Sequence, residues 1–336
     1  MIGFRHRRSP TLAFAVVALL LPALVLACGD DDDADATPTT AATSEGTAEA
    51  TEAAAFPVTV TDLLGREVTI ESEPHNIVAL SPTAVELVYG VGGSVVGRSS
   101  SAIYPPEAES ATDVGSAYQP SFDLVLSLNP DLIIADSVIH ASPNFRDPIA
   151  ALGIPVIFAG AESYQQILDG LRVVGAALGA NEAAEATILE IEGALATAQE
   201  ALDGTGVTAV ALIADRDQTL YAAKSNSYVG DVMQLLGIEN PAAEQPDAGP
   251  FPGYSTLAPE VLIGFDPTIV FTITPAPPPA PRLGELFLQI PPFAGLQAVR
   301  NGNIVEVDVE IALQAPGPRV VELFAALTAA VAETGS

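Results

Sequence analysis

Histidine and cysteine, which carry much of the nucleophilic, acid–base and metal chemistry of proteins, are scarce in this chain of 336 residues. Cys28 is the only cysteine, so the chain can form neither a disulfide framework nor a thiolate metal cluster. Of the three histidines, His140 follows a predicted buried strand, where it could line a cleft. The sequence also lacks a G-x-S-x-G motif and a glycine-rich phosphate loop that opens a helix. These absences argue against an enzyme and against a bound metal or cofactor.

The charge balance excludes a second group of functions. The chain has 42 acidic and 12 basic residues, and loss of a leader that carries Arg5, Arg7 and Arg8 leaves a formal charge of −33. A surface this acidic repels nucleic acid and anionic lipid headgroups. We therefore expect no nucleic-acid partner and no electrostatic binding to a membrane.

The first 55 residues read as a targeting segment followed by a tether. A basic start and an apolar run over residues 11–27, too short for a comfortable membrane span, predict a signal peptide over residues 1–27. Cys28 directly follows "LVLA", which resembles the lipobox of bacterial lipoproteins and implies lipidation at this cysteine. Residues 28–55 are rich in Asp, Thr, Ala, Glu and Ser and contain no aromatic or large aliphatic residue, which predicts a disordered tether.

From residue 56 onwards, apolar runs typical of buried strands alternate with helical segments through short turns. The segment "VTVTDLLGREVTI" predicts a hairpin, and "HNIVALSPTAVEL" predicts a buried strand followed by a helix that starts at Ser-Pro. This alternation predicts parallel sheets covered on both faces, in a lobe over residues 56–180 and another over residues 205–336.

One long helix is predicted to join the two lobes, over residues 181–204. Asn181 is placed as its N-cap and Gly204 as its C′ glycine, and about 21 residues at about 1.5 Å each span roughly 30 Å. One face is apolar, with residues spaced by three and four: Ala184, Ile188, Ile191, Leu195, Ala198 and Leu202. The halves on either side align internally, because Glu86 and Asp231 each stand six residues before a glycine.

The loops that follow the predicted strands nominate a ligand site, because open α/β sheets bind ligands outside the carboxyl ends of their strands. These loops are rich in aromatic side chains, which can pack on a planar ligand, and in cations, which can meet carboxylate or phosphate groups. For each aromatic residue alone, plain packing is the alternative. We expect the ligand to contact Arg98, Tyr104, Tyr118, His140, Arg216, Tyr221, Phe251, Tyr254 and Arg319.

Several segments together carry a family resemblance: "VTDLLGREVTI", "VVGRSSSAIYPPEA", "LNPDLIIAD", "LGIPVIF" and "APGPRVVEL". They resemble the helical-backbone class of periplasmic binding proteins, the substrate-binding lipoproteins of ABC importers for iron–siderophore chelates, haem and cobalamin. The resemblance implies two Rossmann-like lobes bridged by one rigid helix, and an extracytoplasmic monomer held to the membrane only by its lipid anchor. It also implies that one acidic residue on each lobe docks onto the permease. Glu86 matches the first position and Asp231 the second, although some family members have the second acid where Gln234 stands.

The resemblance leaves the ligand open between a ferric siderophore, haem and a cobalamin-like molecule. Tyr118 and Phe251 fall near aromatic positions that pack on the corrin in the cobalamin branch, but Ser101 replaces an aromatic residue and the chain has no tryptophan. For anionic siderophores the family uses cleft arginines and tyrosines. Two other functions remain open: a ligand sensor on the same fold, and a hydrolase that relies on carboxylates.

Overall fold

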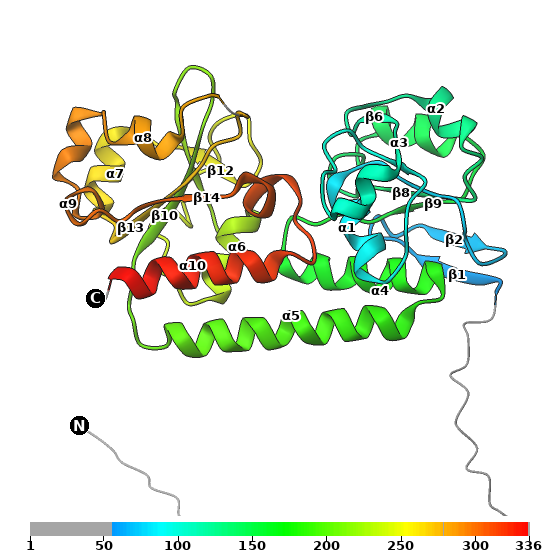
Figure 1. The fold of residues 1–336 in the computed structure, drawn as a ribbon. Coiled ribbons are helices and arrows are strands. Elements are labelled where there is room, and N and C mark those ends of the chain that lie inside the picture. The colour runs from blue at the N-terminus through cyan, green and yellow to red at the C-terminus, as the bar shows by residue number, and fades with distance from the viewer. Residues whose placement is uncertain (1–55, 278, 335–336) are drawn as a thin grey trace, which may run out of the picture. The chain divides into compact units, whose positions relative to one another are not determined.

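The computed structural model describes residues 56–277 and 279–334, which belong to one compact unit, Thr51–Ser336. The predicted signal peptide, Cys28 and the predicted tether lie outside the described residues. Within the described part of the chain, no helix is both long and apolar enough to cross a bilayer. Figure 1 shows the two α/β lobes, whose sheets lie above the long helix α5 (Asn181–Leu202).

The N-terminal lobe is built on a five-stranded sheet in which all neighbouring strands are parallel. In spatial order its strands are β5 (Thr112–Asp113), β4 (Gly97–Arg98), β3 (Ile77–Ala79), β8 (Leu132–Ala135) and β9 (Val156–Phe158). The last three strands are buried throughout, as their uninterrupted apolar sequence requires. Two antiparallel hairpins complete the lobe: β1 (Val58–Thr61) with β2 (Glu67–Ile70), which confirms the predicted hairpin, and β6 (Gly115–Ser116) with β7 (Gln119–Pro120).

Three helices of this lobe begin at a serine whose hydroxyl caps the helix. The Ser81 hydroxyl accepts a hydrogen bond from the Ala84 amide at 3.0 Å and starts α1 (Pro82–Gly90), as the Ser-Pro motif predicts. The other helices of the lobe are η1 (Pro106–Ser110), α2 (Phe122–Ser127), α3 (Pro143–Ala150) and α4 (Tyr164–Leu178). No helix is predicted for residues 161–180, so α4 is an addition to the expected fold. It is bounded by the Ser163 cap and by Gly179, whose φ is +71°.

The C-terminal lobe has a mixed sheet, in contrast to the parallel sheet that the sequence predicts. In spatial order its strands are β12 (Tyr254–Thr256), β11 (Leu220–Ala223), β10 (Ala209–Ala214), β13 (Ile269–Ile273) and β14 (Ile304–Val307). The last three are parallel, whereas β11 and β12 are antiparallel to their neighbours. The five residues between β10 and β11 suffice for a hairpin but not for a crossover, so β11 must run back along β10.

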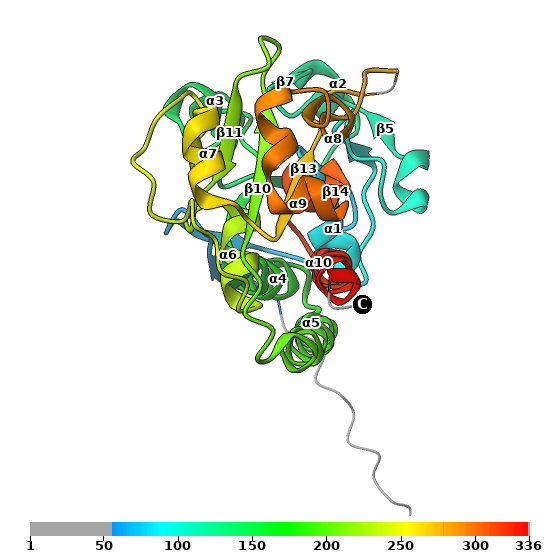
Figure 2. The ribbon, with the colours of Figure 1, turned by 90° about the vertical axis from the view of Figure 1, so that its left-hand side faces the viewer.

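The helical segments of this lobe are α6 (Tyr228–Leu235), α7 (Pro259–Phe265), α8 (Leu283–Phe287), η2 (Pro291–Gly295), α9 (Gln297–Asn301), the π-helical turn η3 (Glu310–Gln314) and α10 (Val320–Thr334). In both views α4 and α10 lie between α5 and the sheets (Figure 1 and Figure 2). Helix α4 contacts α1 and β1, whereas α10 contacts η3 and β13, so each is the last helix of its own lobe.

The bridging helix α5 forms as predicted, with one difference at its start. Asn181 is its first helical residue and not its N-cap; Ala180 takes that place, and its carbonyl accepts from the Ala184 amide at 3.0 Å. The helix can start there because Gly179 ends α4 just before it. At the other end Gly204 has a φ of +73°, as expected of a C′ glycine.

The largest apolar core runs through both lobes and α5 without interruption. It includes Ile77 from β3, Ile188 from α5 and Phe271 from β13. Two smaller clusters, one in each lobe, contain the alternate residues of the same strands, such as Val78 and Val270. The lobes are therefore joined by shared apolar packing as well as by the chain.

Candidate ligand-binding site and the seam between the lobes

Three aromatic rings form a supported cluster in the N-terminal lobe. Tyr118, in the β6–β7 turn, is 62% exposed and contacts Phe145 of α3 edge to face, with ring centroids 6.3 Å apart. Phe145 contacts the His140 ring in the same manner at 6.2 Å. A surface cavity of about 230 Å³ lies beside Tyr118 and Phe145. The cluster offers a planar ligand an exposed ring that is held from behind.

His140 supports this cluster from inside the lobe, and does not line the cleft surface expected from the sequence. Its side chain is fully buried. The Asp136 amide donates to Nδ1 at 2.9 Å, so Nε2 carries the proton and donates to the Ala117 carbonyl at 2.7 Å. Burial lowers the pKa of His140, which keeps the ring neutral. Both nitrogens are therefore occupied, and neither is free to ligate a metal.

A second aromatic cluster lies in the C-terminal lobe. Phe251 is 38% exposed and meets the buried Tyr221 ring edge to face at 5.0 Å. The Tyr221 hydroxyl donates to Asp215 Oδ2 at 2.7 Å, and this bond, together with backbone amides of the same turn, lowers the pKa of Asp215. Gly249 passes so close to the Tyr221 ring that a Cβ there would lie 2.7 Å from Cε1. Tyr254, by contrast, is buried in β12 and offers no comparable surface.

The basic residues of the predicted site differ in how far they are engaged. Arg98 donates from Nη1 to the Ser99 carbonyl at 3.1 Å, and its Nε is buried without a hydrogen-bond partner among the described residues. Arg216 is exposed in the β10–β11 turn. Lys224 pairs with Asp247.

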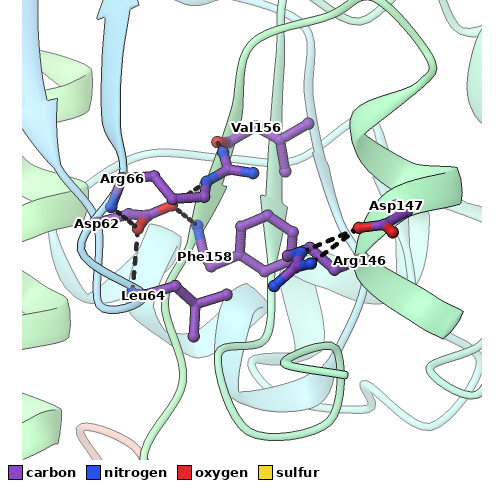
Figure 3. Close-up of polar contacts among 7 residues, drawn as sticks. All are labelled: Asp62, Leu64, Arg66, Arg146, Asp147, Val156 and Phe158. Carbon is purple, nitrogen blue, oxygen red and sulfur yellow. Dashed lines mark hydrogen bonds and ion pairs between the residues drawn. The ribbon is translucent and has the colours of Figure 1, made fainter. Parts of the chain in front are cut away.

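Two further arginines serve the N-terminal lobe itself (Figure 3). Arg66 donates to Asp62 Oδ2 at 3.1 Å and to the Val156 carbonyl at 2.7 Å, and lies over the Phe158 ring. These contacts fasten the β1–β2 hairpin to β9. Arg146 pairs with Asp147 on α3 at 3.0 Å.

Arg319, expected at the ligand, instead joins the two lobes. Its Nε and Nη2 donate to Glu86 Oε1 on α1 at 2.9 and 2.6 Å, and Nη2 lies 3.5 Å from Glu310 Oε2. Its guanidinium also covers the Tyr104 ring at 4.2 Å from the centroid. The structure thus brings Tyr104 and Arg319 together, but the Arg319 guanidinium is paired with the Glu86 carboxylate.

The carboxylate at the centre of this contact is buried. Glu86 is 4% exposed, and its Oε2 has no hydrogen-bond partner among the described residues. Gly317 leaves room for that oxygen, since a Cβ there would lie 3.2 Å from it. Burial raises the pKa of Glu86 to about 7, although Arg319 opposes the shift.

Asp231 makes a second contact between the lobes. Its Oδ2 accepts from the backbone amide of Tyr164, the first residue of α4, at 2.7 Å. Asp231 is half-buried, whereas Gln234 on the same helix is exposed. A carboxylate at a helix N-terminus is stabilised by the unpaired amides and by the helix dipole.

An acidic pocket of about 390 Å³ lies at this seam, apart from the aromatic clusters. Its walls come from α1, the 104–107 loop, α5 and the start of α10, and they carry Glu86, Glu107, Glu190, Arg319 and Glu322. Four carboxylates and one guanidinium, already paired, do not suit a multiply anionic chelate.

Sequence reasoning counted Phe145 among the aromatic residues of the candidate loops but did not list it as a ligand contact. It missed Glu310 and the Tyr164 amide as partners of the site residues. These two meet their partners only through the fold, and no local motif marks them. Among the described residues no group of three or more His, Cys, Asp or Glu side chains is arranged to hold a metal ion.

Two α/β lobes on one bridging helix, each with an exposed aromatic cluster near the strand ends, define a two-lobed solute-binding protein. The chain belongs to the periplasmic binding protein family, whose model matches residues 77–310. This confirms the family and the fold class that the sequence predicts.

Individual proteins of known sequence or structure are similar over most of the chain. YvrC of Bacillus subtilis, an uncharacterized ABC transporter substrate-binding lipoprotein, is 26% identical over 91% of this chain and 92% of its own. A cobalamin-binding protein of Halobacterium salinarum is 29% identical over 85% of this chain and 77% of its own. The periplasmic heme-binding protein RhuT from Roseiflexus sp. RS-1, solved in apo form, is 27% identical with a TM-score of 0.66, over 79% of this chain and 100% of its own.

Proposed function

We propose that this protein is the solute-binding component of an ABC importer, held outside the cytoplasm by a lipid on Cys28. It binds a metal chelate between its lobes and hands it to the permease as a monomer, without catalysing a reaction. The family supports the binding role, and the relatives named as a transporter lipoprotein and as a cobalamin-binding protein support the transport role and the ligand class.

The observation that carries the ligand class is the pair of aromatic clusters. Tyr118 and Phe251 expose ring surface, one from each lobe, and a second ring contacts each of them edge to face. Such surfaces suit a large ligand with planar or apolar faces. Arg98 and Arg216 add positive charge for carboxylate or phosphate groups on its rim.

Among metal chelates, a cobalamin-like molecule fits these residues best. Arg319 is already paired with Glu86, so a multiply anionic ferric siderophore would depend on few cations, mainly Arg98 and Arg216. Haem held through an axial histidine is disfavoured, because both nitrogens of His140 already form hydrogen bonds.

Docking to the permease is assigned to Glu86 and Asp231, one acid from each lobe. Glu86 can meet an arginine of the permease only after Arg319 has released it, and Asp231 only after it has left the Tyr164 amide. Reversing both charges is expected to abolish uptake, and unchanged uptake would contradict the docking assignment.

A thermal-shift series on the full chain tests the ligand class, with cobalamin, haem and a panel of ferric siderophores. At about 100 times its dissociation constant a ligand adds roughly 2.7 kcal/mol to the free energy of unfolding, which raises the melting temperature by several degrees. We expect cobalamin to give this shift, and Tyr118→Ala and Phe251→Ala to reduce it. Leu288→Ala, at an exposed apolar residue just after α8 and outside the clusters, is the control. No shift with any chelate would contradict the proposal.

A further inference from the structure

We infer that Glu86 and Asp231 are positioning residues, which tie the two lobes to each other and so set the spacing of the ligand-contacting surfaces. Each acid stands on the first helix of one lobe and reaches the start of the last helix of the other lobe. Glu86 on α1 holds Arg319 just before α10, and Asp231 on α6 holds the first amide of α4.

The two ties occupy equivalent places in the internal repeat. Helices α1 and α6 both begin at a serine cap, Ser81 and Ser227, and both are followed by a glycine with positive φ, Gly92 and Gly237. Each acid lies six residues before that glycine. The two contacts are therefore equivalent in the repeat. In one, the acid of the N-terminal lobe contacts the C-terminal lobe, and in the other the acid of the C-terminal lobe contacts the N-terminal lobe.

The Glu86 tie holds both lobes through several groups at once. The N-terminal lobe supplies Glu86 and Tyr104, and the C-terminal lobe supplies Arg319 and Glu310. Because a guanidinium bound through two nitrogens and stacked on a ring has a fixed orientation, this contact resists sliding as well as separation.

The Asp231 tie restrains the lobes at a different point. Helix α4 packs along α5 and also contacts α6, so the hydrogen bond from the Tyr164 amide connects α6 to the bridging helix through α4. With α5 as a covalent link and two polar ties beside it, a hinge movement between the lobes about any axis that does not pass through both ties must break at least one of them. This inference depends on neither the cargo nor the permease, so it can fail while the proposed function stands, and the reverse.

Pulsed electron paramagnetic resonance measures the lobe spacing without a ligand. Spin labels are attached through Glu109→Cys and Gln289→Cys, two exposed positions in opposite lobes, in the full chain with Cys28→Ser. The parent should give one narrow distance distribution. Glu86→Gln combined with Asp231→Ala should broaden it and add a second distance, and each single change should produce part of this effect.

A matched control distinguishes the loss of the contacts between the lobes from a general loss of stability. Asp131→Ala removes a carboxylate that accepts from the His75 and Asn76 amides within one lobe, so it should leave the distance distribution unchanged. If the double variant does not fold, Arg319→Lys, which keeps the charge, is combined with Asp231→Asn, which keeps the size, to weaken both ties. A folded variant of either kind with the parent's distribution would overturn the inference.

Discussion

The two contacts across the seam hold the same place in the internal repeat but use different chemistry. Glu86 is almost fully buried and faces a guanidinium, whereas Asp231 is half-buried and faces a neutral backbone amide. The attraction within the buried ion pair offsets the cost of removing two charges from water. Loss of one partner therefore lowers stability strongly, because the other charge stays buried and unpaired. The Asp231 carboxylate is partly hydrated and so costs little to desolvate. Its removal leaves only the Tyr164 amide without a partner.

The largest effect is expected from Arg319→Ala, which leaves Glu86 buried without its counter-charge. We expect the free energy of unfolding to fall by about 2–4 kcal/mol in urea denaturation. Arg172→Ala is the control, because Arg172 also meets two carboxylates, Asp169 and Glu185, but in an exposed position, where the loss should stay below about 1 kcal/mol. Equal losses of unfolding free energy in Arg319→Ala and Arg172→Ala would contradict the claim that the buried ion pair matters more for stability than the exposed one.

The next largest effect is expected in the pH dependence of stability, through Glu86. The pKa of Glu86 is about 7 in the folded protein and 4.5 in the reference state, so the folded state binds the proton more tightly. The contribution of Glu86 to stability is therefore largest below pH 4.5 and declines as the pH rises to 7. The charged groups that act on Glu86 are Arg319, Glu310 and Glu322. Burial, and to a lesser extent the charge of Glu86, raises the pKa of the nearby Tyr228 hydroxyl.

Comparing wild type with Glu86→Gln isolates the contribution of Glu86 to the pH dependence of stability. Between pH 4.5 and pH 7, wild type should lose about 2–3 kcal/mol more stability than the variant, measured by urea denaturation at several pH values. The same comparison with Asp231→Asn serves as the control for an acid at the equivalent place. Parallel pH profiles of wild type and Glu86→Gln would contradict the raised pKa.

A smaller effect is expected from Asp231→Ala, which removes a hydrogen bond to the first amide of α4. Loss of such a capping carboxylate typically costs about 1 kcal/mol. Asp131→Ala should have a similar effect on stability, because it also deprives backbone amides of a carboxylate. A loss from Asp231→Ala as large as that from Arg319→Ala would remove the distinction between the two ties.

The smallest effect on stability is expected from Tyr118→Ala, because the side chain is 62% exposed. The free energy of unfolding should change by no more than about 0.5 kcal/mol, while affinity for the chelate falls about tenfold, as the loss of about 1.4 kcal/mol of binding energy would produce. Titration calorimetry with cobalamin measures the second quantity. A large loss of stability with unchanged affinity would place Tyr118 in the fold and not at the ligand.

Local signals in the sequence were sufficient for most of the architecture. The Ser81–Pro82 start of α1, the apolar face of α5 and the buried strands all follow from spacing and capping within about 20 residues. The reversed direction of β11 was missed, because its sequence is as apolar as a parallel strand, and only the short turn before it fixes its direction. Helix α4 was missed although Ser163 and Gly179 bound it.

The site was less accessible to sequence reasoning because its contacts join distant segments. Glu86 and Arg319 are separated by 233 positions, and nothing near either residue indicates the other. The burial of His140 depends on packing beneath Phe145, and the loop sequence alone suits an exposed histidine equally well. Loop positions after strands indicate the region of a site, whereas the direction of each side chain is set by tertiary packing.

Titration calorimetry of the full chain with cobalamin tests the central claim most directly, that the lobes together bind a metal chelate. We expect one molecule bound per chain, a negative heat-capacity change from the buried apolar surface, and weaker binding in both Tyr118→Ala and Phe251→Ala. Haem and ferric siderophores are titrated in parallel under the same conditions. A folded protein that binds none of these chelates would contradict the claim.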